Sequence, residues 1–187
     1  MVDRIIWILM RCEEPILDVG SADGWVFRDT DLDVTYVDID LYDLPNFIRA
    51  DAHNLPLPDN SYNTVVLAEI LEHVYNPIQV LREAKRVSYN KILITVPDEF
   101  HWAPEHKPFM TIEERLEEEN TTIEELAKKS NPNVKELSED LTHLWHKRYY
   151  TGAMLSEHLK LAGITNFTLE HLEYGGWAFW VVEAHAM

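Results

Sequence analysis

An apolar run that ends in an acid and a loop of small residues is the feature that most constrains the fold of this chain. Residues 16–19 read Ile-Leu-Asp-Val, and residues 20–24 read Gly-Ser-Ala-Asp-Gly. A buried parallel strand delivers main-chain amides to a nucleotide-like ligand in this way, at the carboxyl edge of a sheet. The loop needs small residues because a Cβ would hold the ligand away from the backbone. A dinucleotide fingerprint would need a third glycine at position 25, where Trp25 stands, so the spacing indicates a different nucleotide ligand.

The segments that follow predict strands and helices in alternation. Five apolar or β-branched runs are typical of a parallel sheet covered on both faces: Ile16–Val19, Val34–Val37, Phe47–Ala50, Thr64–Leu67 and Ile92–Val96. Asn76 and Pro77 suit the N-cap and the first position of a helix, and residues 151–162 carry a second apolar helical stripe. Residues 165–172 and 177–183 predict a closing antiparallel hairpin.

Two connections in the first half of the chain are unusually short. About nine residues separate Gly24 from the second predicted strand, which leaves room for a turn or two of helix. The sequence between Asp40 and Phe47 gives no helical pattern. We therefore expect a trimmed version of the alternating fold.

Four sequence signals occur in the order expected for a nucleoside site at the ends of these strands. The loop led by Asp18 is followed, twenty residues later, by Asp38 at the end of the second apolar run. Ala50-Asp51-Ala52 ends the third run, and residues 53–62 form the turn His-Asn-Leu-Pro-Leu-Pro-Asp-Asn-Ser-Tyr. Together these residues resemble the class I S-adenosylmethionine-dependent methyltransferases, in particular those of the type 11-like group.

The resemblance is close over residues 15–97 and loose over residues 141–187. It departs from the family pattern at Ala22, where a glycine is usual, and at Asn63, where an aspartate is usual. It implies an α/β, Rossmann-like fold with a seven-stranded, mostly parallel sheet, an antiparallel last strand and helices on both faces. We expect one methyltransferase domain over residues 1–187.

The resemblance also implies S-adenosyl-L-methionine as the cofactor and a set of residues that bind it. Asp38 would accept hydrogen bonds from the ribose hydroxyls, with Asp40 as a competitor, and Ile39 would lie against the adenine. Asp51 would accept the adenine amino group, and the backbone amide of Ala52 would reach a ring nitrogen. The full expected set is Asp18, Gly20, Ser21, Ala22, Gly24, Asp38, Ile39, Asp51, Ala52, Ala68 and Glu69.

The turn after the fourth predicted strand, Ala68-Glu69-Ile70-Leu71-Glu72-His73-Val74, lies where the methyl group should emerge. His73 is the first candidate for removing a proton from an alcohol acceptor. If the turn is helical, Glu69, Glu72 and His73 share one face. This pattern resembles the Glu-x-x-Glu-His metal motif of ubiquinone-pathway and small-RNA 2′-O-methyltransferases. His146, which stands before the penultimate helix, would then be the fourth ligand of Mg²⁺ or Mn²⁺.

A second interpretation of the same residues needs no metal. The glutamates would have an ordinary structural role, and His73, with His146 as the other catalytic candidate, would act as a plain general base. From the sequence we favour this interpretation over the metal site.

Residues 98–145 carry no strand pattern and are expected to form an acidic helical lid inserted into the domain. Two capping boxes, Thr111-x-x-Glu114 and Thr122-x-x-Glu125, predict short helices. Bulky aromatic residues at the ends of the segment would close over the substrate. These residues are Trp102, Phe109, Trp145, Tyr149 and Tyr150.

The charge of this 187-residue chain limits its partners. Its 33 acidic and 16 basic residues give a net charge of −17, which disfavours nucleic acids and anionic membranes. Cys12 is the only cysteine, so no internal disulfide can form, which fits a reducing, cytoplasmic location. The apolar run at residues 5–10 is too short to span a membrane and predicts a first helix.

We therefore expect an enzyme that methylates an oxygen atom of a small-molecule or glycan-like acceptor. Two alternatives remain open. RNA ribose 2′-O-methylation has the metal motif in its favour and the charge against it, and it would need a basic groove at the lid. A non-catalytic S-adenosylmethionine-binding protein that regulates a partner would keep the cofactor residues and lose the acceptor pocket.

Overall fold

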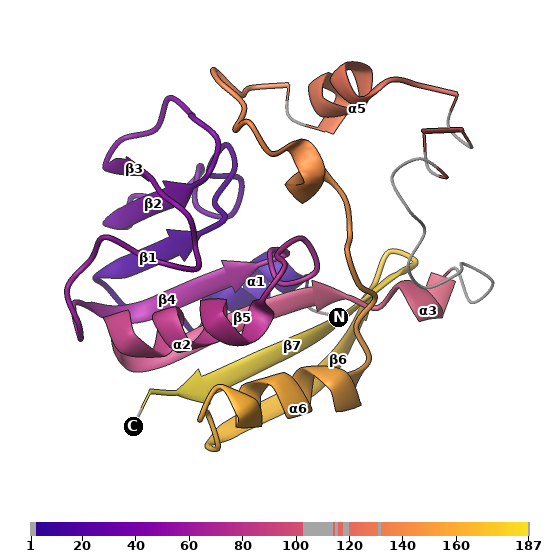
Figure 1. Ribbon diagram of the computed structural model, residues 1–187. Helices are drawn as coiled ribbons and strands as arrows, with labels where there is room; N and C mark the ends of the chain where they lie inside the picture. The colour runs from indigo at the N-terminus through magenta and orange to yellow at the C-terminus, as the bar shows by residue number, and fades with distance from the viewer. Residues whose placement is uncertain (1–2, 103–113, 115, 118–119, 131, 187) are drawn as a thin grey trace.

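Figure 1 shows the fold in a computed structural model, which describes residues 3–102, 114, 116–117, 120–130 and 132–186. The strands are β1 (Ile16–Val19), β2 (Val34–Asp38), β3 (Phe47–Arg49), β4 (Tyr62–Ala68), β5 (Ser88–Pro97), β6 (Phe167–Tyr174) and β7 (Trp177–His185). The helices are α1 (Arg4–Leu9), α2 (Pro77–Val87), α3 (Glu99–Trp102), α5 (Ile123–Ser130), the 3₁₀ helix η1 (Leu141–Leu144) and α6 (Gly152–Leu161). Among these helices, none is long and apolar enough to cross a membrane.

The seven strands form one sheet in the order β3-β2-β1-β4-β5-β7-β6. Strands β1 to β5 run parallel, whereas β7 is antiparallel to both of its neighbours, β5 and β6. This confirms the predicted mostly parallel sheet with an antiparallel last strand. Because β2 and β4 lie on opposite sides of β1, the strand order reverses at the carboxyl end of β1, where α/β sheets bind their ligands.

The strands lie where the apolar runs predict them, and β1 has the predicted bounds. The largest difference is at β5, which was expected at residues 92–96 and begins instead at Ser88. Residues 88–91 read Ser-Tyr-Asn-Lys, so the apolar pattern gives no sign of this extension. Ser88 also provides the C-cap of α2, and the chain therefore passes from helix to strand without a loop.

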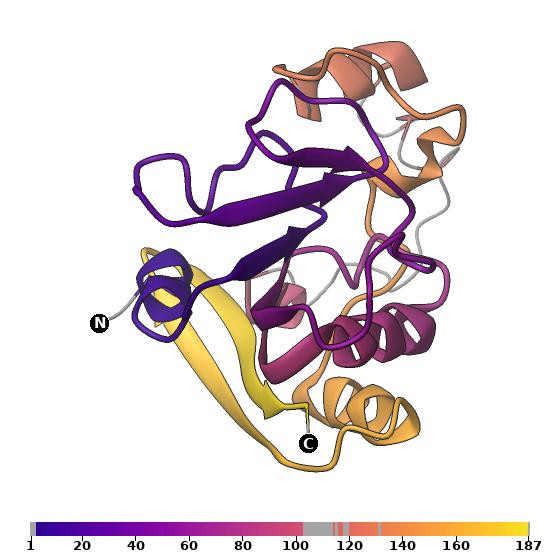
Figure 2. The ribbon, with the colours of Figure 1, turned by 90° about the vertical axis from the view of Figure 1, so that its left-hand side faces the viewer.

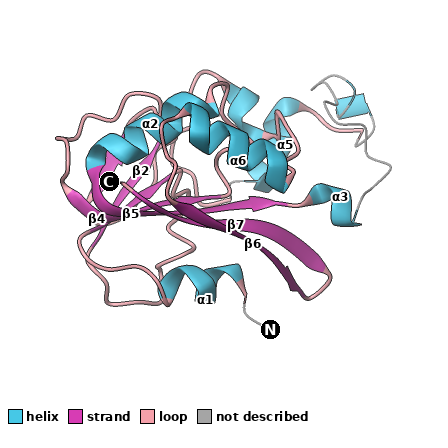
Figure 3. Cartoon of the chain, turned by 90° about the horizontal axis from the view of Figure 1, so that it is seen from below, coloured by secondary structure: helices cyan, strands magenta, loops and turns pink. Residues whose placement is uncertain are grey.

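Helices cover both faces of the sheet, as Figure 3 shows. On one face, Trp7 and Ile8 of α1 pack into a buried group with the apolar residues of β1 and β2. On the other face, α2 and α6 contribute Leu81 and Leu155 to a larger buried group. The predicted caps are present: the Asn76 side chain accepts a hydrogen bond from the Gln79 amide at 3.1 Å, and Thr151 caps α6 in the same way.

No helix connects β1 to β2 or β2 to β3 in these fully described stretches. The expected turn or two of helix after Gly24 is replaced by hydrogen-bonded turns, in which the amides of Phe27 and Arg28 both donate to the Gly24 carbonyl at 3.0 Å. The segment at residues 133–144 lies beside this trimmed end of the sheet (Figure 2). The Leu41 amide donates to the Glu136 carbonyl at 2.8 Å. The segment therefore covers a part of the sheet edge that a longer connection between β2 and β3 would cover.

We expect Gly20→Ala to lower the melting temperature more than Gly176→Ala does. Gly20 has a φ of +73°, and an added Cβ would lie 2.5 Å from Cδ1 of Ile70. Gly176 has a φ of +86° but open space around it. Both changes carry the left-handed strain of about 1–2 kcal/mol, and only Gly20→Ala adds overpacking of about 1–3 kcal/mol. Scanning calorimetry measures the difference, and equal losses would contradict the steric argument.

Candidate functional site

A cavity of about 330 Å³ opens at the carboxyl edge of the sheet, beside the end of β1. The ends of β1 and β2 and the turns that follow β3 and β4 line it. Of the expected cofactor residues, its walls contain Gly20, Ala22, Asp38, Ile39, Asp51, Ala52 and Glu69. Four others, Asp18, Ser21, Gly24 and Ala68, are not lining residues. The structure thus gathers most of a set that spans fifty residues of sequence around one space.

The loop after β1 is held against β2 by its own amides. The Gly20 and Ser21 amides donate to the Val37 carbonyl at 2.8 and 3.1 Å, and the Ala22 amide donates to Oδ2 of Asp38 at 2.8 Å. Ala22 adopts a φ of +45°, a left-handed conformation that costs a residue with a Cβ about 1–2 kcal/mol. Ala22 therefore holds this backbone conformation at an energetic cost, as residues at functional sites often do.

Asp18, which leads the loop, is 1% exposed, and its Oδ2 has no hydrogen-bond partner in the described structure. Within the same described residues, the hydroxyl of Ser21 is also buried without a hydrogen-bond partner. Burial, with the nearby charge of Asp38 as a second cause, raises the pKa of Asp18 to about 8. An unpartnered buried acceptor of this kind can receive a hydrogen bond from a polar or cationic ligand group.

The two acids at the end of β2 have different partners. Asp38 accepts hydrogen bonds from the amides of Ala22 and Asp40 and is partly exposed, while burial raises its pKa to about 6. Asp40 is 1% exposed, and it accepts from the Ser138 amide at 2.6 Å and lies 2.9 Å from Nε2 of His143. Both acids line the cavity, but Asp40 is buried against the inserted segment, whereas Asp38 is the more exposed of the two.

Asp51 forms a local pair that the sequence did not predict. Its Oδ1 accepts from the His53 amide at 2.9 Å and lies 2.6 Å from Nδ1 of the same ring. Burial acts to raise the pKa of Asp51, but these His53 contacts outweigh it and the pKa is lowered. Nε2 of His53 in turn accepts from the Asn76 amide at 3.2 Å, so the ring links the turn after β3 to the start of α2.

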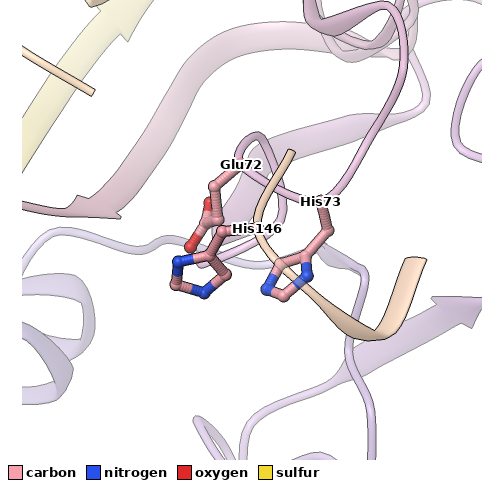
Figure 4. A group of neighbouring side chains, drawn as sticks. All are labelled: Glu72, His73 and His146. Carbon is pink, nitrogen blue, oxygen red and sulfur yellow. The ribbon is translucent and has the colours of Figure 1, made fainter. Parts of the chain in front are cut away.

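Next to the cavity, Glu72, His73 and His146 bring one potential ligand atom each to within 4.8 Å of one another (Figure 4). The rings of His73 and His146 lie with their centroids 4.6 Å apart. Glu72 is 1% exposed, and both of its carboxylate oxygens are buried without a partner in the part of the chain that is described; the same holds for Nδ1 of His73. Nδ1 of His146 lies 2.7 Å from Oε1 of Glu99 in α3.

Burial favours the neutral forms of Glu72 and His73. It raises the pKa of Glu72 well above the ordinary range, and the charge of Glu69 adds to the effect. Burial, together with His146, lowers the pKa of His73 to about 3. A cation placed among these three side chains would reverse this balance, because it would stabilise the carboxylate and occupy the lone pair of the imidazole.

The condition under which Glu69 would share one face with Glu72 and His73, a helical turn after β4, is not met. Glu69 adopts a φ of +56°, and its side chain is turned to another neighbour: Oε1 accepts from the Thr95 hydroxyl at 2.6 Å and lies 3.9 Å from Nε of Arg4. Glu69 still lines the cavity. The clustered candidate ligands are therefore three of the four predicted ones.

The end of the inserted segment closes one side of the cavity. The lining residues from this segment and the next turn are Asp140, His143, Leu144 and Lys147. The Lys147 ammonium donates to the Thr142 carbonyl and lies 4.3 Å from the centroid of the Tyr75 ring. Burial lowers the pKa of Lys147 to about 8. The acidic composition of the segment does not predict these contacts, because they depend on the path of the segment across the edge of the sheet.

The aromatic residues at the ends of the segment have different surroundings from those expected of a lid. Tyr150 is 0% exposed and belongs to the main buried group, with its hydroxyl 3.1 Å from Nδ1 of His158, so its assignment as a substrate-covering residue is wrong. Trp145 is also buried. Tyr149 packs edge-on against Phe100. Phe109 and the side chain of Trp102 lie outside the described residues.

Comparison with known proteins finds similarity to methyltransferases. A family model described as a methyltransferase domain matches residues 17–90. No curated protein matches the chain significantly.

Many solved structures share the fold. One is a SAM-dependent methyltransferase from Thermotoga maritima, described as a possible histamine N-methyltransferase, with a TM-score of 0.60, 16% identity and coverage of 98% of this chain and 88% of that one. A SAM-dependent methyltransferase from Aquifex aeolicus has a TM-score of 0.54 and 17% identity, with coverage of 92% of this chain and 81% of that one. A SAM-dependent methyltransferase from Archaeoglobus fulgidus has a TM-score of 0.57 and 14% identity, with coverage of 90% of this chain and 85% of that one. At these identities the likeness concerns the fold.

Proposed function

Through the domain at residues 17–90 the chain belongs to the class I S-adenosylmethionine-dependent methyltransferases, and we propose that it methylates an oxygen atom of a small-molecule or glycan-like acceptor. S-adenosylmethionine is the methyl donor that the family implies. One observation carries the proposal: Glu72, buried and without a partner among the described residues, lies beside His146 and beside His73, which lines the cavity. A hydroxyl acceptor must lose its proton on methylation, and such a cluster can promote that loss.

The residues around the cavity fit the methyl donor. Asp38 and Asp51 contribute carboxylates to the cavity walls, where they would accept hydrogen bonds from the ribose hydroxyls and the adenine amino group. Asp18 and Ser21 lie behind the cavity wall, and their oxygens without partners among the described residues would become available to the donor only if the loop moved. Binding at these points would aim the methyl group toward the turn after β4, where His73 stands.

Glu72, His73 and His146 would hold a divalent cation. Both Glu72 oxygens and Nδ1 of His73 are buried without partners in the described part of the chain, an arrangement that a bound cation would stabilise. A carboxylate with two imidazoles suits Mn²⁺ or Zn²⁺, and it suits Mg²⁺, which prefers oxygen ligands, less well. When bound, such an ion would acidify the acceptor hydroxyl and position it in line with the methyl group.

The electrostatics of the cluster favour this metal-assisted route over a plain histidine base. An efficient general base has a pKa near the working pH. Burial lowers the pKa of His73 to about 3, so this side chain would accept a proton poorly. His146, which lies 2.7 Å from Oε1 of Glu99, is the other metal-free candidate because this contact orients its ring.

Labelled methyl transfer tests the proposal directly. The protein is incubated with methyl-labelled S-adenosylmethionine and separate pools of hydroxyl-bearing small molecules, glycans, amines and RNA. We expect O-methylated products from the first or second pool, loss of transfer with EDTA at unchanged donor affinity, and recovery with Mn²⁺ or Mg²⁺. Transfer that survives EDTA, or that occurs only to amines, contradicts the proposal. Transfer only to RNA would favour ribose 2′-O-methylation, which the net charge of −17 opposes. Binding of S-adenosylmethionine without transfer to any pool would favour a regulatory role.

We also propose that residues 98–145 act as a lid whose second half is latched over the donor. Three contacts attach this half to the sheet edge: Asn133 donates to Asp23 at 2.7 Å, Arg49 pairs with Glu136 at 2.7 Å, and His143 lies 2.9 Å from Asp40. The last of these is sensitive to pH. Both His143 nitrogens face acceptors, the Asp40 carboxylate and the Asp140 carbonyl, which favours the charged ring.

Donor affinity should therefore weaken as the pH rises. Burial acts to lower the pKa of His143, but its hydrogen bond to Asp40 and the nearby negative charges outweigh this effect and raise it. A raised pKa means that the latch is complete below the ordinary histidine range and is lost as the pH rises through the raised value.

Calorimetric titration with S-adenosylmethionine at a series of pH values checks this latch. Ionisation of Asp38, whose pKa is about 6, should strengthen donor binding as the pH rises, and it occurs in both the wild type and the His143→Gln variant. We expect His143→Gln to remove the alkaline loss of affinity, whereas His185→Gln, a histidine of β7 that does not line the cavity, should leave it unchanged. An identical pH profile for His143→Gln and the wild type would refute the latch.

A further inference from the structure

A second group of ionisable side chains lies outside the cavity walls, where α3 meets the β6–β7 hairpin. It consists of His101 of α3 and His171 and Glu173 of β6, whose ligand atoms all lie within 4.8 Å of one another. Nδ1 of His101 is 3.9 Å from Oε1 of Glu173, and Nδ1 of His171 is 3.7 Å from the same oxygen. None of the three lines the cavity or belongs to the Glu72 cluster.

These separations approach those of a tetrahedral zinc site. With metal–ligand bonds of about 2.0–2.1 Å, ligand atoms lie roughly 3.4 Å apart. The two measured distances exceed that value by a few tenths of an ångström, which small rotations of half-exposed side chains can remove. Two imidazoles and one carboxylate, with a fourth position open to solvent, form a ligand set that suits Zn²⁺ and disfavours Mg²⁺.

The buried side chain of Asp98 supplies a second, independent reason. Its Oδ2 lies 2.9 Å from Nε2 of His171, and Asp98 itself is buried. This contact places the ring proton on Nε2 and leaves the lone pair of Nδ1 directed toward Glu173. Metal-binding histidines characteristically donate their other N–H to a carboxylate in this way. The ring of Trp180 packs on the His171 ring at a centroid distance of 4.5 Å and further fixes its orientation.

We propose that His101, His171 and Glu173 form a zinc-type metal site, with Asp98 orienting His171. The site would fasten α3, the first element of the inserted segment, to the C-terminal hairpin. Because α3 also carries Glu99, which contacts His146, occupation of this site would steady one side of the Glu72 cluster. The proposal is independent of the methyl acceptor and of whether a metal takes part in catalysis.

Zinc titration of the full chain tests the site. The experiment uses Glu72→Gln as the background, in which the Glu72 cluster is disabled, and follows binding by calorimetry after treatment with chelator. We expect one equivalent of Zn²⁺. His101→Ala and His171→Ala should each weaken binding at least tenfold, and Asp98→Asn should weaken it by about 10- to 100-fold through its effect on the ring. His185→Ala, the matched control, should leave binding unchanged.

The melting temperature provides a second readout that does not depend on activity. Zn²⁺ should raise it in the background protein and in the His185→Ala control, and should have no such effect in the His101→Ala and His171→Ala variants. Exposed His101 is the variant least able to disturb folding, so it is decisive. Zinc binding that is unchanged in His101→Ala would overturn the proposal. Failure of the Glu72→Gln background protein to bind one equivalent of Zn²⁺ would overturn it as well.

Discussion

We expect Asp38→Ala to lower the affinity for S-adenosylmethionine by about 100-fold. The carboxylate would accept hydrogen bonds from two ribose hydroxyls, and hydrogen bonds to a charged group contribute about 1.5–3 kcal/mol each. A loss of about 1.4 kcal/mol of binding free energy corresponds to a factor of ten in affinity. The change also removes the acceptor of the Ala22 amide, which holds the strained loop in place. Titration calorimetry measures the loss.

Asp33→Ala is the matched control for this change. Asp33 is an exposed acid directly before β2, at the opposite edge of the sheet, so its removal alters the net charge equally without touching the cavity. Its affinity for the donor should stay within about twofold of the wild type. Equal affinities for Asp38→Ala and the wild type, or binding of NAD in place of S-adenosylmethionine, would contradict the assignment of the cavity.

Glu72→Gln should separate activity from stability. The substitution keeps the shape of the side chain but removes the anionic ligand, so we expect methyl transfer to fall by about 100-fold or more while donor affinity changes little. Burial raises the pKa of Glu72, and a buried acid with a raised pKa destabilises the protein increasingly as the pH rises above the range of an unfolded glutamate. Metal-free Glu72→Gln should therefore melt at the same temperature as the wild type near pH 4 and at a higher temperature near pH 8.

Glu83→Gln provides the comparison. Glu83 is also buried, but it accepts from the Leu55 amide at 2.8 Å and pairs with Arg86 at 2.7 Å, and these partners lower its pKa. Its substitution should lower the melting temperature at neutral pH and leave metal dependence unchanged. If Glu72→Gln also lowers the melting temperature at neutral pH, Glu72 has a structural partner and the cation hypothesis fails.

The local parts of the fold could be predicted from the sequence because their signals are short-range. The apolar run and small-residue loop at 16–24 specify a strand, a tight turn and an edge of the sheet within nine residues. The caps of α2 and α6 lie next to the helices they begin. For the same reason the acids at the ends of β2 and β3 could be assigned to one site before their distances were known.

The remaining features depend on contacts between distant segments or on single dihedral angles. Glu69 does not share a helical face with Glu72 and His73, because its backbone lies in the left-handed region. The spacing of these residues in the sequence does not reveal this dihedral angle. The buried position of Tyr150 follows from the course of the chain into α6. The pairs Asp98–His171 and Asp40–His143 join residues 73 and 103 positions apart, so no local pattern could indicate them.

The attachment of residues 133–144 to the trimmed end of the sheet has a consequence for the order of folding. Asp40 binds Ser138 across 98 residues, and Arg49 binds Glu136 across 87, so these contacts form only after most of the chain has been synthesised and a long loop has closed. Contacts of such high sequence separation form slowly. The nucleoside end of the cavity would therefore be completed late in folding, and a donor that binds there would drive that last step toward the native state.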